Sequence, residues 1–352
     1  MVGPFQADPG NRIELTFDIE NVGTASGTQD LVLTAEDGSK ITVDTLQDLE
    51  LQVDQLNSAT LTWDIDNQQA EDTYQLCVES EDDSDCVEVL IGDIQVGSRL
   101  FGLAEDTGVY QYSASTPFDI SSLSFTNTSF SIRDAVSNQN LRTAGLFFGD
   151  NGTKMFIGDY ETDSVYEFSL DIFYTLSTAS YTGVSVSTPD SSVDGLAFDS
   201  SGSRFYVISA QEVIYQYNLS TNWDLSTASN SGNTLDVSGE DLISRGVDFN
   251  NDGSKLYMAG GNSNAIYVYD LSTNYEISSA SYSGVSLDTS QQLSETPTST
   301  TFNDDGSILY VTDVNGIYSY SLSTPFDLST ATYVTSFTNT EDAFLQSIVW
   351  NK

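Results

Sequence analysis

Three acidic residues at alternate positions form the pattern in this sequence that comes nearest to a metal-binding motif. Asp159, Glu161 and Asp163 stand two residues apart in a short loop, as the first oxygen ligands of a calcium loop do. The corresponding loops at residues 209–212 and 260–264 do not repeat this spacing. We therefore interpret the three residues as an acidic surface loop, keep calcium as the lesser alternative, and expect no cofactor beyond nonspecific salt cations.

The two cysteines of the chain, Cys77 and Cys86, flank an acidic run at residues 79–85. If Ser80 and Asp83 pair across a two-residue turn, Cys77 lies directly opposite Cys86, within reach of a disulfide. We predict a structural disulfide that holds an acidic hairpin together. Two buried free thiols are the alternative, because alternation places both side chains on one face. A metal site is disfavoured because no third soft ligand lies nearby.

The absence of histidine excludes most of the usual enzyme chemistry. Without imidazole there is no Ser-His-Asp or Cys-His arrangement, no histidine-ligated zinc and no histidine general base. A hydrolase would have to work with carboxylates, tyrosines or one of very few lysines. We expect no catalytic residues and a non-enzymatic protein, with a metal-dependent hydrolase as a minor alternative.

The strongly negative charge of the chain favours a high-salt solvent and disfavours nucleic acid and anionic lipid as partners. The 352 residues include 52 Asp and Glu but only 10 Lys and Arg, a formal net charge of −42. Such a polyanion repels nucleic acid and anionic lipid, yet 18 Phe and 19 Tyr argue for a folded core. Self-repulsion of this size is relieved when molar salt shortens the screening length to about 3 Å. We interpret the protein as halophilic; an acidic mesophilic surface protein is the alternative.

The first quarter of the chain predicts a β-sandwich. Ile13, Leu15, Phe17 and Ile19 alternate with polar residues, and similar runs follow between turn-forming clusters. About seven short strands in residues 1–96 is the pattern of an immunoglobulin-like fold. The run at residues 11–23 resembles the CARDB-type Ig-like modules of prokaryotic surface proteins.

From Gly97 onward the sequence repeats. Glycine opens five similar segments at Gly97, Gly152, Gly202, Gly253 and Gly306. Each is followed by a strand with two aromatics, and the first tyrosines of four such pairs are Tyr110, Tyr166, Tyr215 and Tyr267. A period near 50 residues made of strands and turns predicts a five-bladed β-propeller over residues 97–352. A further aromatic near the end of each unit is interpreted as a wedge that packs a loop against a strand, with a carbohydrate platform as the alternative.

The ends of the repeat predict how the ring closes. Four units carry an extra strand before their glycine, beginning at Ala144, Asp194, Arg245 and Thr298, whereas the first unit begins directly at Gly97. The missing strand stands at the C-terminal end, from Gln346 to Trp350. We expect this strand to complete the first blade, which would leave no open outer edge in the ring.

The blade pattern resembles the YVTN/NHL-like propeller repeats, in particular those of phage and archaeal virus tail, fibre or spike proteins and of microbial surface proteins. Its elements here are a Gly-Leu-x-Phe strand, an Asp-Gly turn, Lys-Leu-Tyr, an Ile-Tyr-x-Tyr strand and Leu-Ser-Thr. The likeness implies the fold. Some relatives are metal-dependent hydrolases with histidine or clustered acidic ligands, a pattern from which this chain departs.

The resulting functional expectation is a non-enzymatic virion surface protein of a halophilic archaeal virus, a spike, turret or tail-associated subunit. It would contact other virion proteins, be displayed in many copies, and recognise a host cell-surface protein or glycan. The alternative is a secreted or cell-wall-associated adhesion protein of a halophilic archaeon. The start of the sequence, Met1 to Phe5, predicts no signal peptide, and no loop carries a recognisable binding motif.

Overall fold

A computed structural model describes residues 5–7, 12–20, 27–36, 40–51, 56–64, 72–79, 84–91, 95–105, 108–189, 192–339 and 344–352. The chain consists of two compact units, Met1–Ile94 and Gln95–Lys352. No helix within the described ranges is long and apolar enough to cross a membrane.

The N-terminal unit is built of β-strands. One sheet has the order β1-β7-β6-β3-β4, and β2 pairs with β5 in a second. The run of alternating apolar residues that begins at Ile13 lies in β2, where Leu15 stands opposite Leu61. Whether this unit is immunoglobulin-like stays a prediction. The strands are β1 (Phe5–Ala7), β2 (Arg12–Glu20), β3 (Gly27–Glu36), β4 (Lys40–Leu51), β5 (Leu56–Asp64), β6 (Asp72–Glu79) and β7 (Ser84–Ile91).

The two cysteines lie in neighbouring strands of the larger sheet. The antiparallel register of β6 and β7 places Cys77 opposite Cys86 and Glu79 opposite Ser84, which is the register expected from a turn between Ser80 and Asp83. Cys77 is disulfide-bonded.

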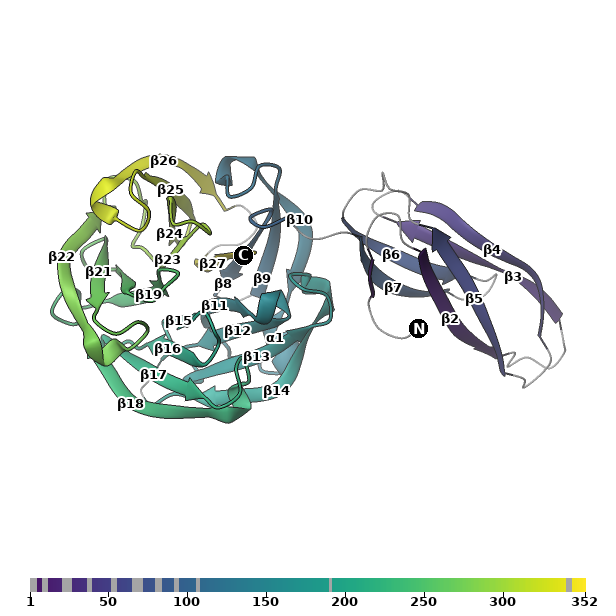
Figure 1. The fold of residues 1–352 in the computed structure, drawn as a ribbon, viewed down its shortest axis with the longest axis horizontal. Helices are drawn as coiled ribbons and strands as arrows, with labels where there is room; N and C mark the ends of the chain where they lie inside the picture. The colour runs from purple at the N-terminus through teal and green to yellow at the C-terminus, as the bar shows by residue number, and fades with distance from the viewer. Residues whose placement is uncertain are drawn as a thin grey trace. The chain divides into compact units, whose positions relative to one another are not determined.

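The described residues of the second unit form five four-stranded antiparallel sheets arranged around an axis (Figure 1), which confirms the predicted five-bladed propeller. The innermost strand of each blade contacts the innermost strands of its two neighbours. Blade 1 contains β8 (Arg99–Ala104), β9 (Gly108–Ala114), β10 (Leu123–Phe130) and β27 (Leu345–Trp350); blade 2, β11 (Thr143–Gly149), β12 (Lys154–Asp159), β13 (Ser164–Leu170) and β14 (Ala179–Ser187); blade 3, β15 (Gly195–Phe198), β16 (Arg204–Ile208), β17 (Val213–Leu219) and β18 (Ala228–Asp236); blade 4, β19 (Ser244–Phe249), β20 (Lys255–Gly260), β21 (Ala265–Leu271) and β22 (Ala280–Asp288); blade 5, β23 (Ser299–Phe302), β24 (Ile308–Asp313), β25 (Gly316–Leu322) and β26 (Ala331–Thr338).

The last strand closes the ring as predicted. Blade 1 has the strand order β10-β9-β8-β27, with β27 in the innermost place (Figure 1). We call the junction between the two ends of the propeller sequence the seam. Val349 of β27 pairs with Phe101 of β8 across it, and the Trp350 side chain is fully buried. Blade 1 is therefore held together by strands from the two ends of the propeller sequence.

The recurring aromatic is a wedge, as expected from its repetition. Trp223 lies against Gly202, where an added Cβ would come within 2.1 Å of the indole, and the four other blades repeat the contact. The wedge residues share a left-handed backbone, which Trp223 adopts at φ 61°. The five pairs are Phe118 with Gly97, Tyr174 with Gly152, Trp223 with Gly202, Tyr275 with Gly253 and Phe326 with Gly306.

Tyrosine hydroxyls join successive blades through the backbone of these wedges. Tyr257 donates to the carbonyl oxygen of Phe326 at 2.6 Å, and Tyr206 donates in the same way to Tyr275. Tyr310 of blade 5 donates to the carbonyl oxygen of Phe118 in blade 1. The third of these bonds spans the same seam that β27 closes.

The structure also contains helical segments that the repeat did not predict. A short helix, α1 (Ile132–Val136), stands in the connection between blades 1 and 2. Ser131 caps its start by accepting from the backbone amide of Asp134, and Arg133 donates to the carbonyl oxygen of Leu141. The 3₁₀ turns are η1 (Ile120–Ser122), η2 (Asp150–Gly152), η3 (Leu176–Thr178), η4 (Leu225–Thr227), η5 (Ile277–Ser279) and η6 (Leu328–Thr330).

Candidate functional site

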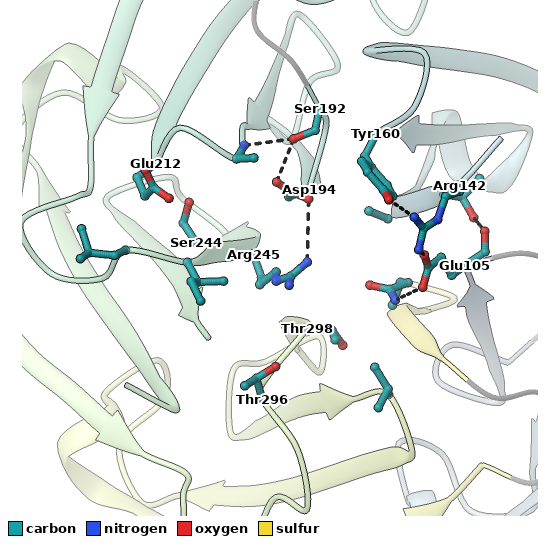
Figure 2. A pocket seen from close by; sticks show the side chains of 17 residues that line it. Glu105, Arg142, Tyr160, Ser192, Asp194, Glu212, Ser244, Arg245, Thr296 and Thr298 are labelled. Atoms are coloured by element: carbon teal, nitrogen blue, oxygen red, sulfur yellow. Dashed lines mark hydrogen bonds and ion pairs between the residues drawn. The ribbon is translucent and has the colours of Figure 1, made fainter. Parts of the chain in front are cut away.

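A cavity of about 650 Å³ occupies one end of the propeller axis, and we call it the cup. All five blades contribute to its wall, either through the connection that leads into the innermost strand or through the hairpin between the second and third strands. Figure 2 shows its polar side chains converging from several directions. A volume of this size accommodates a small molecule.

One residue at the start of each innermost strand, either inside the strand or directly before it, lines the cup, and the five together form a ring. These residues occupy the same place in each repeat, directly before the small residue at which the strands approach one another. The residue type at this place differs in every blade. The ring consists of Ala144, Asp194, Arg245, Thr298 and Gln346.

Below the ring, small residues bring the innermost strands into backbone contact. An added Cβ on Gly195 would lie 2.8 Å from the Cα of Gly246, and one on Gly246 would lie 2.7 Å from the Cα of Ser299. The hydroxyls of Ser299 and Ser347 lie 3.4 Å apart. Because real Cβ contacts are longer than these distances, only glycine fits at 195 and 246 without moving the backbone. We call this level the waist.

A second cavity, of about 320 Å³, lies on the other side of the waist. The hairpin turns between first and second strands line it, together with wedge aromatics such as Trp223 and Tyr275. It shares no lining residue with the cup. The cup is therefore a blind pocket above the waist.

Arg142 forms a rigid corner of the cup (Figure 2). Its guanidinium donates to Glu105, whose side chain is only 13% exposed, and to the Tyr160 hydroxyl. It also lies 3.6 Å from a carboxylate oxygen of Glu161 and 4.8 Å from the centre of the Tyr160 ring. Such a guanidinium, held by carboxylates and an aromatic face, has a fixed orientation.

Arg245 and Asp194 form the second charged pair of the cup, and this pair is looser. Arg245 Nη1 lies 3.9 Å from Asp194 Oδ1. Ser192 donates to Asp194 Oδ2 at 3.0 Å and accepts from the Ala210 amide at 3.1 Å. Burial raises the pKa of Asp194 above its usual value, although Arg245 acts in the opposite direction. The Nε of Arg245 is buried without a hydrogen-bond partner among the described residues, so this arginine is held at an energetic cost.

Glu212 and two aliphatic side chains complete the mouth. Desolvation and then the charge of Asp194 raise the pKa of Glu212. Leu242 and Ile243 line the cup in the connection to β19 and are 64% and 43% exposed. We call these two the apolar lip. The lip therefore leaves aliphatic surface in contact with water beside the charged groups of the cup.

The three acidic residues that suggested calcium have different partners. Asp159 is buried and accepts from the Thr162 amide and hydroxyl and from the Arg142 amide. Glu161 faces Arg142, and Asp163 accepts from the Ser192 amide at 2.6 Å. Burial raises the pKa of Asp159. Within the described part of the chain, no group of three His, Cys, Asp or Glu side chains is arranged to hold a metal.

Sequence reasoning did not identify the cup. The ring residues Ala144, Asp194, Arg245, Thr298 and Gln346 stand in one column of the aligned innermost strands, but the column three places later also differs in every unit and does not line the cup. Variation between units therefore does not by itself point to the cup, which becomes visible only when the blades are arranged around the axis.

The chain matches no family model, and no curated protein sequence matches it. Among solved structures, a chain of a nidogen/laminin complex is 12% identical, with 71% of this chain and 97% of that chain covered and a TM-score of 0.47. A proposed 6-phosphogluconolactonase of Bacteroides uniformis is 12% identical over 92% of this chain and 99% of its own, with a TM-score of 0.44. A Lactobacillus plantarum protein is 12% identical over 92% and 99%, with a TM-score of 0.42.

Proposed function

We propose that this chain is a non-enzymatic recognition protein exposed at a particle or cell surface in high salt, and that the cup is its binding site. The specific setting that we propose is the virion surface of a halophilic archaeal virus, where the chain contacts other virion proteins and attaches the particle to a host. A secreted or cell-wall-associated adhesion protein of a halophilic archaeon is the second candidate.

The observation that carries the proposal is the blind, asymmetric cup. Its ring differs in every blade, and its arginines face carboxylates of the same cup, Glu105 for Arg142 and Asp194 for Arg245. Charged groups that hold one another in place form a preorganised surface for hydrogen bonding to a ligand.

One further feature supports a location outside the cell, and another supports a high-salt solvent. The disulfide of Cys77 is of the kind that persists in an oxidising environment. The net charge of −42 keeps a compact chain soluble in salt that screens its self-repulsion.

The test is competition for attachment. The purified full-length chain, added in excess in molar salt, should block adsorption of the virus or cell that carries it, as should antibodies raised against the chain. Because many weak copies acting together raise avidity by about 100-fold or more, the free chain should compete only at high concentration. Detection in purified virions favours the viral setting, and detection only in cell envelopes favours adhesion. Normal adsorption of antibody-coated particles would contradict a recognition role.

A further inference from the structure

We propose that the cup binds the terminal unit of a neutral saccharide. The proposal rests on the recognition function above and names its ligand class. Four properties of the cup lead to it: its hydrogen-bonding groups, its apolar lip, its balance of charge and its closed floor.

The ring presents planar polar side chains around one space. Asp194 offers carboxylate acceptors, Arg245 offers guanidinium donors, and Gln346 offers one donor group and one acceptor. Sugar hydroxyls both donate and accept, and two neighbouring hydroxyls match the two ends of a planar carboxylate, guanidinium or amide. The Thr298 hydroxyl at the same level is buried and bonds to Thr312 and to the carbonyl oxygen of Leu345, so the three charged or amide side chains supply the ligand contacts.

The apolar lip offers an aliphatic surface on which the C–H face of a sugar ring can pack. One face of a pyranose ring carries mainly C–H groups, which gain by leaving water. Leu242 and Ile243 are exposed at the mouth and line the same cavity as the ring. A ligand seated on the ring would cover aliphatic surface that water otherwise contacts.

The charges of the cup favour a neutral ligand over an acidic one. Among the residues that the structure describes, its lining holds two arginines, Arg142 and Arg245, against three carboxylates, those of Glu105, Asp194 and Glu212. An anion would meet this excess of negative charge and the −42 of the whole chain. At about 1 M salt the screening length is only about 3 Å, so long-range attraction contributes little. Direct hydrogen bonds to uncharged hydroxyls do not depend on such attraction.

The floor of the cup determines which part of a saccharide enters. The waist at Gly195, Gly246 and Ser299 lies directly below the ring, and the second cavity shares no wall with the cup. A polysaccharide cannot thread through a pocket closed in this way. A chain end can enter it, and about 650 Å³ leaves room for one sugar unit with surrounding water.

The experiment measures binding of defined sugars to the full-length chain in molar KCl. A glycan array that includes neutral, uronic acid and sulfated termini gives the preference, and calorimetry with methyl glycosides of glucose, galactose and mannose gives affinities. We expect binding of at least one neutral terminus, with a Kd on the order of 1 mM. That Kd should change less than about twofold between about 1 M and about 3 M KCl, because charge attraction is already screened.

Variants connect this binding to the cup. Arg245→Gln and Asp194→Asn should each weaken it by about tenfold or more, because each removes a charged hydrogen-bonding partner. Lys255→Gln and Asp270→Asn, which alter the ion pair between β20 and β21 outside the cup, should bind as the unaltered chain does. A single cooperative unfolding transition in each cup variant, at a melting temperature well above that of the binding assay, would show that the variants are folded.

The outcomes separate this proposal from the one on which it rests. Binding of acidic termini only, binding of none of the neutral termini, or wild-type affinity in both cup variants would overturn the saccharide proposal. If the chain still competes for attachment in any of those cases, the recognition function stands with another ligand. If a neutral terminus binds but the chain never competes, the cup takes a sugar and the attachment function fails.

Discussion

At the scale of single residues, the wedge contacts explain why glycine opens every repeat. Gly202 has φ +69° and lies under the Trp223 ring, whereas Gly232, at φ +81° in β18, has nothing within 4 Å of an added Cβ. The two glycines share a left-handed backbone conformation and differ in the space that is available to an added Cβ.

This pair predicts a measurable difference in stability. Gly202→Ala should lower the free energy of unfolding by about 3 kcal/mol, because the cost of the backbone strain and the cost of overpacking against the Trp223 ring add together. Gly232→Ala should cost only about 1 kcal/mol for the backbone strain. Denaturant unfolding in molar salt measures both. Equal losses in the two variants would show that the wedge contact contributes nothing.

Asp194 gives a prediction about pH. Burial raises its pKa in the folded protein, so protonation favours folding. Its stabilising effect is present below the unfolded pKa of about 3.9 and is lost as the pH rises through the folded value. Asp194→Asn should therefore melt above the unaltered chain at neutral pH. The gap should close as the pH falls toward about 4.

A carboxylate with the opposite shift provides the control. The Ser290 hydroxyl and amide lower the pKa of Asp288, so Asp288 stabilises above its unfolded pKa and loses that effect on acidification. Asp288→Asn should then melt below the unaltered chain at neutral pH, with a gap that closes in acid. A gap of the same sign in both variants, followed from neutral pH to about pH 4 by melting temperature, would refute this assignment.

At the scale of elements, the propeller depends on the contacts of one seam. Tyr310 donates across it to the Phe118 carbonyl, and blades 1 and 2 carry Phe101 and Phe156 where the other three have tyrosine. Tyr310→Phe should fit and should cost about 1 kcal/mol for the lost hydrogen bond. Unfolding by denaturant measures the loss, and an unchanged midpoint would mean that the bond adds no stability.

Removal of β27 is the stronger test of the same seam. Deleting residues 345–352 leaves the β8 edge of blade 1 unpaired and exposes apolar surface that Ile348 and Trp350 cover. Unpaired edges template aggregation. We expect a propeller that aggregates or melts at least about 10 °C earlier. A monomeric truncated chain with an unchanged melting temperature would rule out a closing role for this strand.

The blades could be predicted from the sequence because every unit places the same residue types at the same packing positions. Glycine at the turn, paired aromatics and the wedge keep their places, so five copies reinforce one interpretation. The cup escaped prediction for the opposite reason, since Asp194 and Arg245 have no counterpart in other blades. Nor does spacing along the chain indicate that the strands meet at Gly195 and Gly246, because that contact joins different blades. The helix α1 lies in a connection that no other unit repeats.

At the scale of the whole molecule, charge is distributed unevenly between the two units. Residues 1–96 hold 22 acidic and 2 basic side chains, whereas residues 97–352 hold 30 and 8. The propeller also engages its few cations in structure, as in the ion pair of Lys154 with the buried Glu167 at 2.6 Å. The net charge per residue is therefore more than twice as large in the N-terminal part, −20 over 96 residues against −22 over 256, and self-repulsion is stronger there.

This difference predicts the order in which the units respond to salt. As KCl is lowered from about 3 M to about 0.1 M, the screening length grows from a few ångströms to about 10 Å, and repulsion between neighbouring carboxylates rises. The strands of residues 12–91 should lose protection from hydrogen exchange first, while the propeller strands stay protected to lower salt. Hydrogen–deuterium exchange with mass spectrometry on the full chain follows both units in one sample.

The control replaces the salt by sucrose, because sucrose favours compact states without screening charge. Protection that is the same at every salt concentration would contradict the halophilic interpretation, and loss of the propeller first would contradict the role of charge density.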